Sequence, residues 1–145
     1  MTKRRVVITG MGAVSPFGVG VEKFWHNLVE GNSGISTSES IDISKHVVKI
    51  SGEVKDFNPE EYLDPKEAKK MDRFIQFALV AADEAVKDAK LEEVKDVDSY
   101  KIGVIVSAAA GGFRTFEDNH VRILEKGPNK CSPFTIPMMI VNMAS

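Results

Sequence analysis

The sequence predicts an α/β protein whose largely parallel sheet is covered by helices on both sides. Two short runs, at 5–9 and at 102–107, are apolar or β-branched at almost every position. Strands that are buried on both faces of a parallel sheet have this pattern. Between these runs, apolar residues recur at helical spacing. Strands that alternate with helices are typical of the α/β class.

Composition and charge are those of a soluble globular protein. The chain has 145 residues, of which 43% are hydrophobic and 28% charged, and its formal net charge is -2. That charge argues against a general attraction to nucleic acid or to an anionic membrane. No apolar stretch is long enough for a membrane span or a signal peptide. The single cysteine excludes an internal disulfide, so we expect a cytoplasmic protein.

The first elements are expected in the order strand, turn, helix and loop. The first strand enters a glycine-rich segment, 10–12, which is typical of a tight turn. Apolar spacing predicts a helix over 21–30, which Gly31 would end. The segment 32–51 has no sustained period, so we expect a loop with at most short strands around 47–54.

The strongest helix signal begins at Asp64. Asp64 is a good N-cap, Pro65 suits the first helical position, and Glu67 completes a capping-box pattern. One apolar face then continues to residue 89, for about seven turns. We therefore expect one long helix over 64–89.

Three elements are expected after the strand at 102–107. Helical spacing predicts a helix over 115–126, closed by Gly127 and the proline after it. The segment 132–137 contains two prolines and is predicted to be a constrained loop. From Met138 the chain enters an apolar helix and ends within it. We expect from this a fragment whose partner elements lie outside it.

The glycines at 10 and 12 raise the possibility of a dinucleotide site. That fingerprint requires a third glycine at position 15 and a helix that opens there. Position 15 is Ser15, and Pro16 follows it. We therefore expect no nicotinamide cofactor and predict that Gly10 and Gly12 serve a tight turn.

The remaining candidates for catalysis or metal binding are one cysteine and three histidines. Cys131 has no helix that could begin directly behind it, so we interpret it as incidental rather than nucleophilic. His26, His46 and His120 are widely separated and lack metal-ligand spacing. We expect no catalytic residue, no metal and no cofactor from this set.

Two segments have a composition suited to binding. Lys66, Lys69 and Lys70 share one helical face, which is either a solvated face or a docking patch for an acidic partner. The segment 107–112 has six very small residues after a predicted strand, which leaves room for a ligand or for another backbone. The residue pattern alone does not choose between these alternatives.

Four stretches that follow one another along the whole chain carry a family resemblance. They lie at 5–12, 52–57, 69–74 and 127–143. These stretches resemble the elongating β-ketoacyl-[acyl carrier protein] synthases of the thiolase-like family. The resemblance implies a thiolase-like fold, a layered α/β arrangement of two similar halves, in a homodimer. Residues 1–145 would then be the N-terminal part of such a domain, an incomplete first half.

The resemblance also implies a reaction. In these synthases an acyl group moves from a carrier protein to a cysteine thiolate, and two histidines help to decarboxylate malonyl carrier protein. The carbanion attacks the acyl thioester, and the chain grows by two carbons. The family's nucleophile and both histidines would lie beyond Ser145, so we expect this chain alone to be inactive.

The resemblance assigns some lysines to partner binding. Lys66, Lys69 and Lys70, with Lys130, match positions where similar synthases hold the acidic acyl carrier protein. This match favours the docking interpretation of the lysine cluster. Attraction between clustered lysines and an acidic helix would act mainly on association rate and register.

The resemblance also assigns Ala110, Thr135 and Ile136 to an acyl pocket. Relatives usually have isoleucine where this chain has Ala110, and often a second phenylalanine where it has Thr135. Both changes remove bulk, so we hypothesise a roomier pocket or one tuned to another acyl group. Because alanine also replaces glycine within 107–112, any positive φ there would be costly.

Two other functions remain open at this point. One is a non-catalytic partner subunit, like the chain-length-determining relatives that lack the nucleophile. The other is an inactive truncated product. An isolated first half should expose apolar surface and associate with other molecules.

Overall fold

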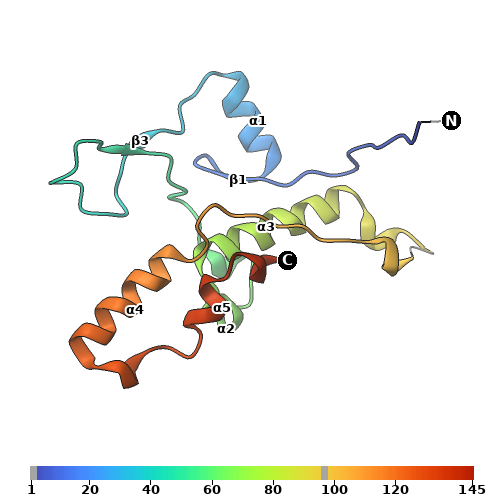
Figure 1. Ribbon diagram of the computed structural model, residues 1–145. Coiled ribbons are helices and arrows are strands. Elements are labelled where there is room, and N and C mark those ends of the chain that lie inside the picture. Colours follow the sequence, from blue (N-terminus) through green and yellow to red (C-terminus); the bar gives the residue numbers. More distant parts are fainter. Residues whose placement is uncertain (1–2, 96–97) are drawn as a thin grey trace. The chain divides into compact units, whose positions relative to one another are not determined.

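The computed structural model describes residues 3–95 and 98–145 (Figure 1). The chain divides into two compact units. The first unit combines Met1–Phe57 with Val80–Val94, and the second combines Asn58–Leu79 with Lys95–Ser145. Residues 1–2 and 96–97, which belong to the N-terminal part expected over 1–145, lie outside the described residues.

In the first unit a short hairpin leads into helix α1. Strand β1 (Val14–Ser15) pairs antiparallel with β2 (Gly18–Val19). Helix α1 follows over Val21–Val29 (Figure 1). Gly31 has a φ of 71°, a left-handed conformation that glycine adopts without strain and that ends the helix. The helix predicted over 21–30 is confirmed.

A second antiparallel pair lies further along the first unit. Strand β3 (Ser36–Thr37) pairs with β4 (Ile50–Ser51). Strand β4 lies in the range 47–54, where a short strand is predicted from the sequence. Strand β3 lies in the predicted loop and has no signal of its own, because two residues are too few to show a period.

The carboxylate of Glu53 holds the segment between these strands. It accepts hydrogen bonds from the hydroxyl of Ser38, from the N–H of Glu39 at 3.0 Å, and from the hydroxyls of Ser40 and Ser51 at 2.8 and 2.9 Å. These bonds, with that from Ser38 the strongest influence, hold the pKa of Glu53 well below its ordinary value. A polar loop is thus ordered by one charged group.

We expect this loop to open as acid protonates Glu53. A carboxylate whose folded pKa is depressed contributes stability that is complete above its ordinary pKa of 4.5 and is lost as the pH falls toward the folded pKa. Amide exchange of residues 36–53, corrected for intrinsic rates, should therefore show falling protection between about pH 5 and about pH 2.5. Glu53→Gln should weaken protection at neutral pH and remove the pH dependence. Protection in the parent chain that does not change with pH would contradict this role of Glu53.

Helix α3 (Arg73–Asp88) is shared between the units, with residues 73–79 in the second and 80–88 in the first. The second unit also contains α2 (Pro65–Ala68), α4 (Phe113–Lys126) and α5 (Thr135–Met139). Short 3-10 helices lie at Pro59–Glu61, Leu91–Glu93, Ser99–Lys101, Pro128–Lys130 and Val141–Ala144.

The helix predicted over 115–126 is confirmed as α4, which begins two residues earlier, at Phe113. It ends at Gly127, whose φ of 85° suits glycine and whose N–H donates to the carbonyl of Ile123 at 2.9 Å. The closing role predicted for Gly127 is therefore also confirmed.

The single helix predicted over 64–89 is wrong, because the structure divides it into α2 and α3. Its start is as predicted: Asp64 caps α2 by accepting from the N–H groups of Lys66 and Glu67 at 2.9 and 3.1 Å. The carboxylate of Glu67 lies 2.6 Å from Nζ of Lys70. Helix α2 is thus a single capped turn.

The break has an identifiable cause at Asp72. The Asp72 carbonyl accepts the first hydrogen bonds of α3, from the N–H groups of Ile75 and Gln76 at 3.0 and 3.2 Å. The Gln76 side chain then donates to the carbonyl of Ala68 at 2.9 Å, which satisfies an acceptor at the end of α2. Asp72 therefore starts a new helix although the apolar spacing continues through it.

The constrained loop predicted over 132–137 is wrong in its second half. Helix α5 begins at Thr135 and ends before Ile140, which has extended backbone. Pro137 is the third residue of α5, in the first turn, where no intrahelical N–H bond is required. The apolar helix expected from Met138 therefore begins earlier and stops sooner than the sequence pattern predicts.

The two buried strands predicted at 5–9 and 102–107 are wrong. Neither run pairs in a sheet, and Val6 and Ile105 are 92% and 96% exposed. Over the described residues the sheets are two antiparallel pairs, so the predicted parallel sheet is not formed there. A strand requires hydrogen-bonded neighbours. An apolar run therefore indicates that a segment can be buried, but it does not show that a neighbouring strand is present to pair with it.

Buried apolar side chains are few in the part of the chain that the structure describes. They are Phe57 and Val80 in the first unit, and Ala68, Ile75 and Ala144 in the second. Close backbone contacts and polar anchors therefore fix much of each unit. None of the described helices combines the length and apolar character that crossing a bilayer needs.

Candidate functional site

Gly10 and Gly12 allow the chain to lie directly against α3. A Cβ atom on Gly10 would lie 2.3 Å from the carbonyl oxygen of Ala85, and one on Gly12 would lie 1.9 Å from that of Ala81. Neither glycine has a positive φ. The tight turn predicted for these glycines is therefore wrong, and close approach to a helix backbone is the reason for both.

Two carboxylates of α3 accept hydrogen bonds from backbone N–H groups in this glycine segment and after it. Met11 donates to Asp88 at 2.9 Å, while Ala13 and Val21 donate to the two oxygens of Glu84 at 2.9 and 2.8 Å. A dinucleotide phosphate would need such N–H groups and would be repelled by the carboxylates. This arrangement is not suited to binding a dinucleotide phosphate.

An apolar hollow of about 660 Å³ lies beside the same segment. Phe24 and Trp25 of α1 contribute to it, and Trp25 is 61% exposed. Its lining residues are Met11, Gly12, Ala13, Val21, Glu22, Phe24 and Trp25. The sequence interpretation assigns no ligand to any of them.

In the second unit the small residues at 107–112 serve a backbone contact. A Cβ atom on Gly111 would lie 2.3 Å from the carbonyl oxygen of Met139, and one on Gly112 would lie 2.2 Å from that of Met138. The N–H of Gly112 donates to the Met139 carbonyl at 3.3 Å. Of the two alternatives, another backbone is therefore the one found at these glycines.

The alanines of this segment are not strained. Among the described residues other than glycine, only Lys90 has a positive φ, so Ala110 does not. Ala110 is exposed and immediately precedes the two glycines that contact the end of α5. The structure thus brings the segment of Ala110 beside the helix that begins with Thr135 and Ile136.

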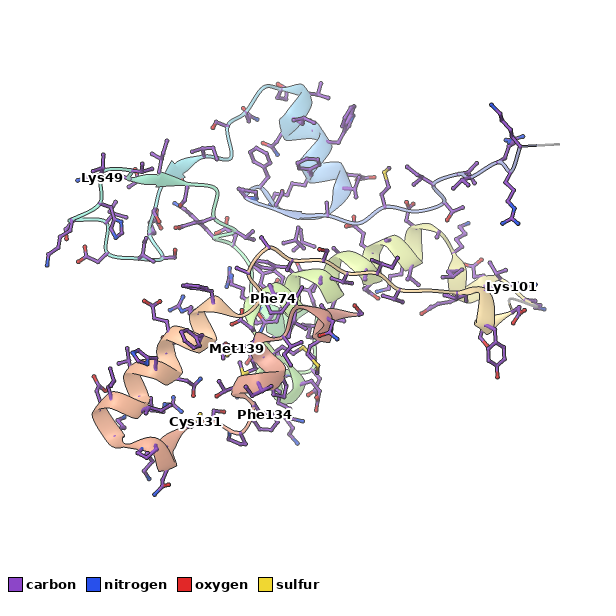
Figure 2. The ribbon with its side chains drawn as sticks, in the orientation of Figure 1. Lys49, Phe74, Lys101, Cys131, Phe134 and Met139 are labelled. Atoms are coloured by element: carbon purple, nitrogen blue, oxygen red, sulfur yellow. The ribbon has the colours of Figure 1, made fainter. Side chains whose placement is uncertain are left out.

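Thr135 and Ile136 differ in their surroundings. Thr135 is only 9% exposed, and its hydroxyl donates to the carbonyl of Ser132 at 2.7 Å. Ile136 is 62% exposed. Figure 2 shows the side chains of this turn between the labelled Cys131 and Met139. Ile136 is therefore available for contact, whereas Thr135 holds the turn.

A chain of buried polar side chains supports this turn, and the sequence interpretation does not include it. The hydroxyl of Thr115 donates to Asp72, and the N–H of Thr115 donates to the same carboxylate at 3.3 Å. Asn119 donates to the carbonyl of Thr115 at 2.8 Å and accepts from the N–H of Ser132 at 3.1 Å. Two polar residues four apart on an amphipathic helix were the available signal.

The four lysines assigned to carrier-protein binding are all exposed. Lys66, Lys69 and Lys70 lie on one short segment, but α2 ends at Ala68, so they do not share a continuous helical face as predicted. Lys69 is the C-cap of α2, a position where the helix dipole favours positive charge. Lys130 lies on another segment, after α4.

Cys131 and the histidines do not assemble into a reactive centre. The thiol of Cys131 is exposed and lies 3.6 Å from the hydroxyl of Thr135. His120 stacks on Phe116 with ring centroids 6.3 Å apart. In the residues that the structure covers, no group of three His, Cys, Asp or Glu side chains is arranged to hold a metal ion.

Comparison with known proteins gives a consistent result. A family model, described as the beta-ketoacyl synthase N-terminal domain, matches residues 3–145. The chain is 46% identical over all 145 residues to a 3-oxoacyl-[acyl-carrier-protein] synthase 2 of Synechocystis sp., and covers 35% of that protein. It is 48% identical over 142 residues, or 98% of its length, to the protein of that name in Staphylococcus aureus strain N315, and covers 34% of it.

The fold is also similar to that of a solved ketosynthase. The structure described as the ishigamide ketosynthase/chain length factor superposes with a TM-score of 0.80 at 27% identity, over 99% of this chain and 36% of the other. The chain thus spans about a third of the length of the relatives that it matches. With a family model that covers nearly every residue, the chain belongs to the beta-ketoacyl synthase family, in the part described as its N-terminal domain.

Proposed function

We propose that this chain supplies the N-terminal part of an elongating β-ketoacyl-[acyl carrier protein] synthase, within one half of a thiolase-like fold. The observation that carries the proposal is 46% identity, over all 145 residues, to a protein named 3-oxoacyl-[acyl-carrier-protein] synthase 2. We further propose that the whole enzyme is a cytoplasmic homodimer of fatty acid biosynthesis. No cofactor is required by this chemistry.

The proposed reaction is a decarboxylative Claisen condensation. Malonyl carrier protein loses carbon dioxide, and the electron pair of the broken bond becomes a carbanion. The carbanion forms a carbon–carbon bond with the acyl group held on an enzyme cysteine, and that cysteine leaves as a thiolate. The product is a 3-oxoacyl carrier protein two carbons longer. We assign none of these steps to Cys131 or to the three histidines, so this chain alone should be inactive.

A chimera tests the proposal directly. In it, this chain replaces the matching N-terminal third of the Synechocystis relative. The chimera should release carbon dioxide and form 3-oxoacyl carrier protein from acyl and malonyl carrier proteins, and the 145-residue chain alone should do neither. A folded chimera without condensing activity would overturn the proposal.

One observation favours a second candidate, a non-catalytic chain-length-determining subunit. The solved structure at TM-score 0.80 is described as a ketosynthase/chain length factor. The identity to it is 27%, against 46% to the synthase, which favours the catalytic function. If the chimera is inactive alone but changes product length when added to an active synthase, the second candidate is correct.

We assign Lys66, Lys69 and Lys70, with Lys130, to docking of the acidic acyl carrier protein. All four lysines are exposed residues, and three lie within five consecutive positions. Lys70 already pairs with Glu67 at 2.6 Å, so Lys66 and Lys69 should contribute more of the attraction. Such charges act mainly on association and are screened by salt.

Reversal of charge in the double variant K66E/K69E should raise the KM for acyl carrier protein. We expect about a tenfold increase at low salt, which shrinks as salt is added, with little change in kcat. Activity of the chimera with a small acyl thioester that lacks the carrier protein should be unchanged. K87E is the matched control, since Lys87 is also exposed and pairs with Asp83 in the first unit. Equal losses in both variants would contradict the docking assignment.

We assign Ala110, Thr135 and Ile136 to the acyl pocket. The close contact of the glycines after Ala110 with the end of α5 supports a common location for the three residues. Ala110 is the better test, because it is exposed, whereas a larger side chain at the buried Thr135 would disturb the turn.

Ala110→Ile should shorten the longest acyl chain that the chimera accepts. The added side-chain bulk would fill part of the proposed pocket, so we expect activity with long acyl groups to fall at least tenfold relative to short ones. Assays with acyl carrier proteins of graded chain length measure this ratio. Ala108→Val, in the same small-residue segment, is the control. If Ala110→Ile accepts the same longest acyl chain as the parent chimera, the assignment of Ala110 to the pocket is wrong.

A further inference from the structure

The hydrogen-bonded polar side chains of the second unit suggest a role for Asn119. We propose that Asn119 is a positioning residue for acyl-chain selectivity, because it fixes the turn at 131–136 that presents Thr135 and Ile136. This proposal rests on the proposed function, in which those two residues belong to the acyl pocket. Asn119 acts through the turn and is not itself assigned to contact the substrate.

Both ends of the Asn119 amide are engaged. The side chain is only 9% exposed. Its nitrogen donates to the carbonyl of Thr115 at 2.8 Å, one turn earlier on α4, and its oxygen accepts from the N–H of Ser132 at 3.1 Å. A buried asparagine in a helix is unfavourable unless its polar atoms are satisfied. Here the second partner lies outside the helix, in the turn.

The hydrogen bonds continue from Ser132 into α5. The Ser132 carbonyl accepts from the hydroxyl of Thr135 at 2.7 Å and from its N–H at 3.1 Å. The Ser132 hydroxyl accepts from the N–H of Phe134 at 3.2 Å. Since Thr135 and Ile136 are the first residues of α5, the position of Ser132 determines where the helix begins.

At its other end, this series of hydrogen bonds reaches the start of α3. Thr115 is 7% exposed, and its hydroxyl and N–H both donate to the Asp72 carboxylate. Asp72 in turn accepts the first backbone bonds of α3. Asn119 therefore connects the turn to the first turn of α4 and, through Thr115, to the start of α3.

Loss of this connection should change selectivity more than rate. Residues that line a pocket discriminate between substrates by their position. A displacement of about 1 Å is enough to change the geometry of a binding site. The reacting groups are proposed to lie outside this chain. Loosening the turn should therefore alter which acyl lengths fit while leaving a favoured length reactive.

Two variants of Asn119 in the chimera test the proposal. Asn119→Leu keeps a similar shape and removes both hydrogen bonds, whereas Asn119→Asp keeps the acceptor for Ser132. The matched control is Ile75→Val, which removes one methyl group from a buried side chain of the same unit and keeps every hydrogen bond of Asn119 and Ser132. Each protein is assayed with acyl carrier proteins of graded length, and amide exchange of residues 131–136 is measured in parallel.

We expect Asn119→Leu to speed exchange of the turn at least tenfold and to shift the ratio of long-chain to short-chain activity at least threefold. Asn119→Asp should show smaller changes in both, and Ile75→Val should change neither. If Asn119→Leu loses total activity but keeps the parental ratio, the selectivity role is wrong. Should Asn119→Leu fail to fold, Asn119→Asp decides: a parental ratio together with faster exchange of the turn overturns the proposal. An inactive parent chimera would refute the proposed function, while unchanged exchange in a folded Asn119→Leu would refute the positioning role separately.

Discussion

Gly12→Ala is expected to unfold the first unit of this chain. The added Cβ would lie 1.9 Å from the carbonyl oxygen of Ala81, which is backbone within α3 and cannot rotate away. The segment must then withdraw from α3 and lose the hydrogen bonds from Met11 and Ala13 to the helix carboxylates. We expect a loss of about 3 kcal/mol or more in the free energy of unfolding.

Urea unfolding followed by tryptophan fluorescence measures this effect. The chain has one tryptophan, Trp25, which lies on α1 in the first unit and reports on that unit. Gly103→Ala is the control, since no atom lies within 4 Å of its added Cβ and its φ is not positive. That variant should change the unfolding midpoint little. A Gly12→Ala midpoint equal to the parent would show that the segment does not lie against α3 in solution.

Glu84→Ala is expected to have the second largest effect. Glu84 accepts hydrogen bonds from the N–H groups of Ala13 and Val21 at 2.9 and 2.8 Å. The N-cap of α1, Gly20, has no side chain to cap the helix, so Glu84 supplies the cap from α3. Hydrogen bonds to a charged group contribute about 1.5–3 kcal/mol each, and partial exposure of Glu84 reduces this, so we expect a loss of about 2 kcal/mol.

Neighbouring substitutions separate this role from a general loss of charge. Glu84→Gln keeps an acceptor and should lose about half as much stability. Asp83→Ala removes an exposed carboxylate that pairs with Lys87 on α3, and should change stability by less than about 0.5 kcal/mol. If Asp83→Ala and Glu84→Ala have equal effects on Trp25 fluorescence transitions, the capping role is wrong.

Helices α1 and α4 and the start of α2 are predictable from sequence because their signals are local. The spacing over 21–30 and 115–126, the Asp64 cap and the closing glycines all act within a few residues, and the structure agrees with each. The strands predicted at 5–9 and 102–107 depend on partners distant in sequence. Apolar composition carries no information about those partners, so these predictions fail.

The residues of the candidate site also fall into those that the sequence predicts and those that only the structure reveals. The exposed lysines follow from composition, and the resemblance leads to Ala110, Thr135 and Ile136. For Asn119 the sequence offers only its spacing from Thr115 on one helix, because an asparagine on a helix is usually solvated and the fold alone brings Ser132 within reach of it. The purpose of Gly10 and Gly12 is likewise set by what packs on them rather than by their own dihedral angles.

The exposed thiol of Cys131 has a practical consequence for work with this protein. In air, the thiols of two molecules can oxidise to an intermolecular disulfide, and the covalent pair would elute in size-exclusion chromatography like a homodimer. A true non-covalent dimer keeps its elution volume in the presence of reductant and in Cys131→Ser. An artefactual pair reverts to single molecules in both.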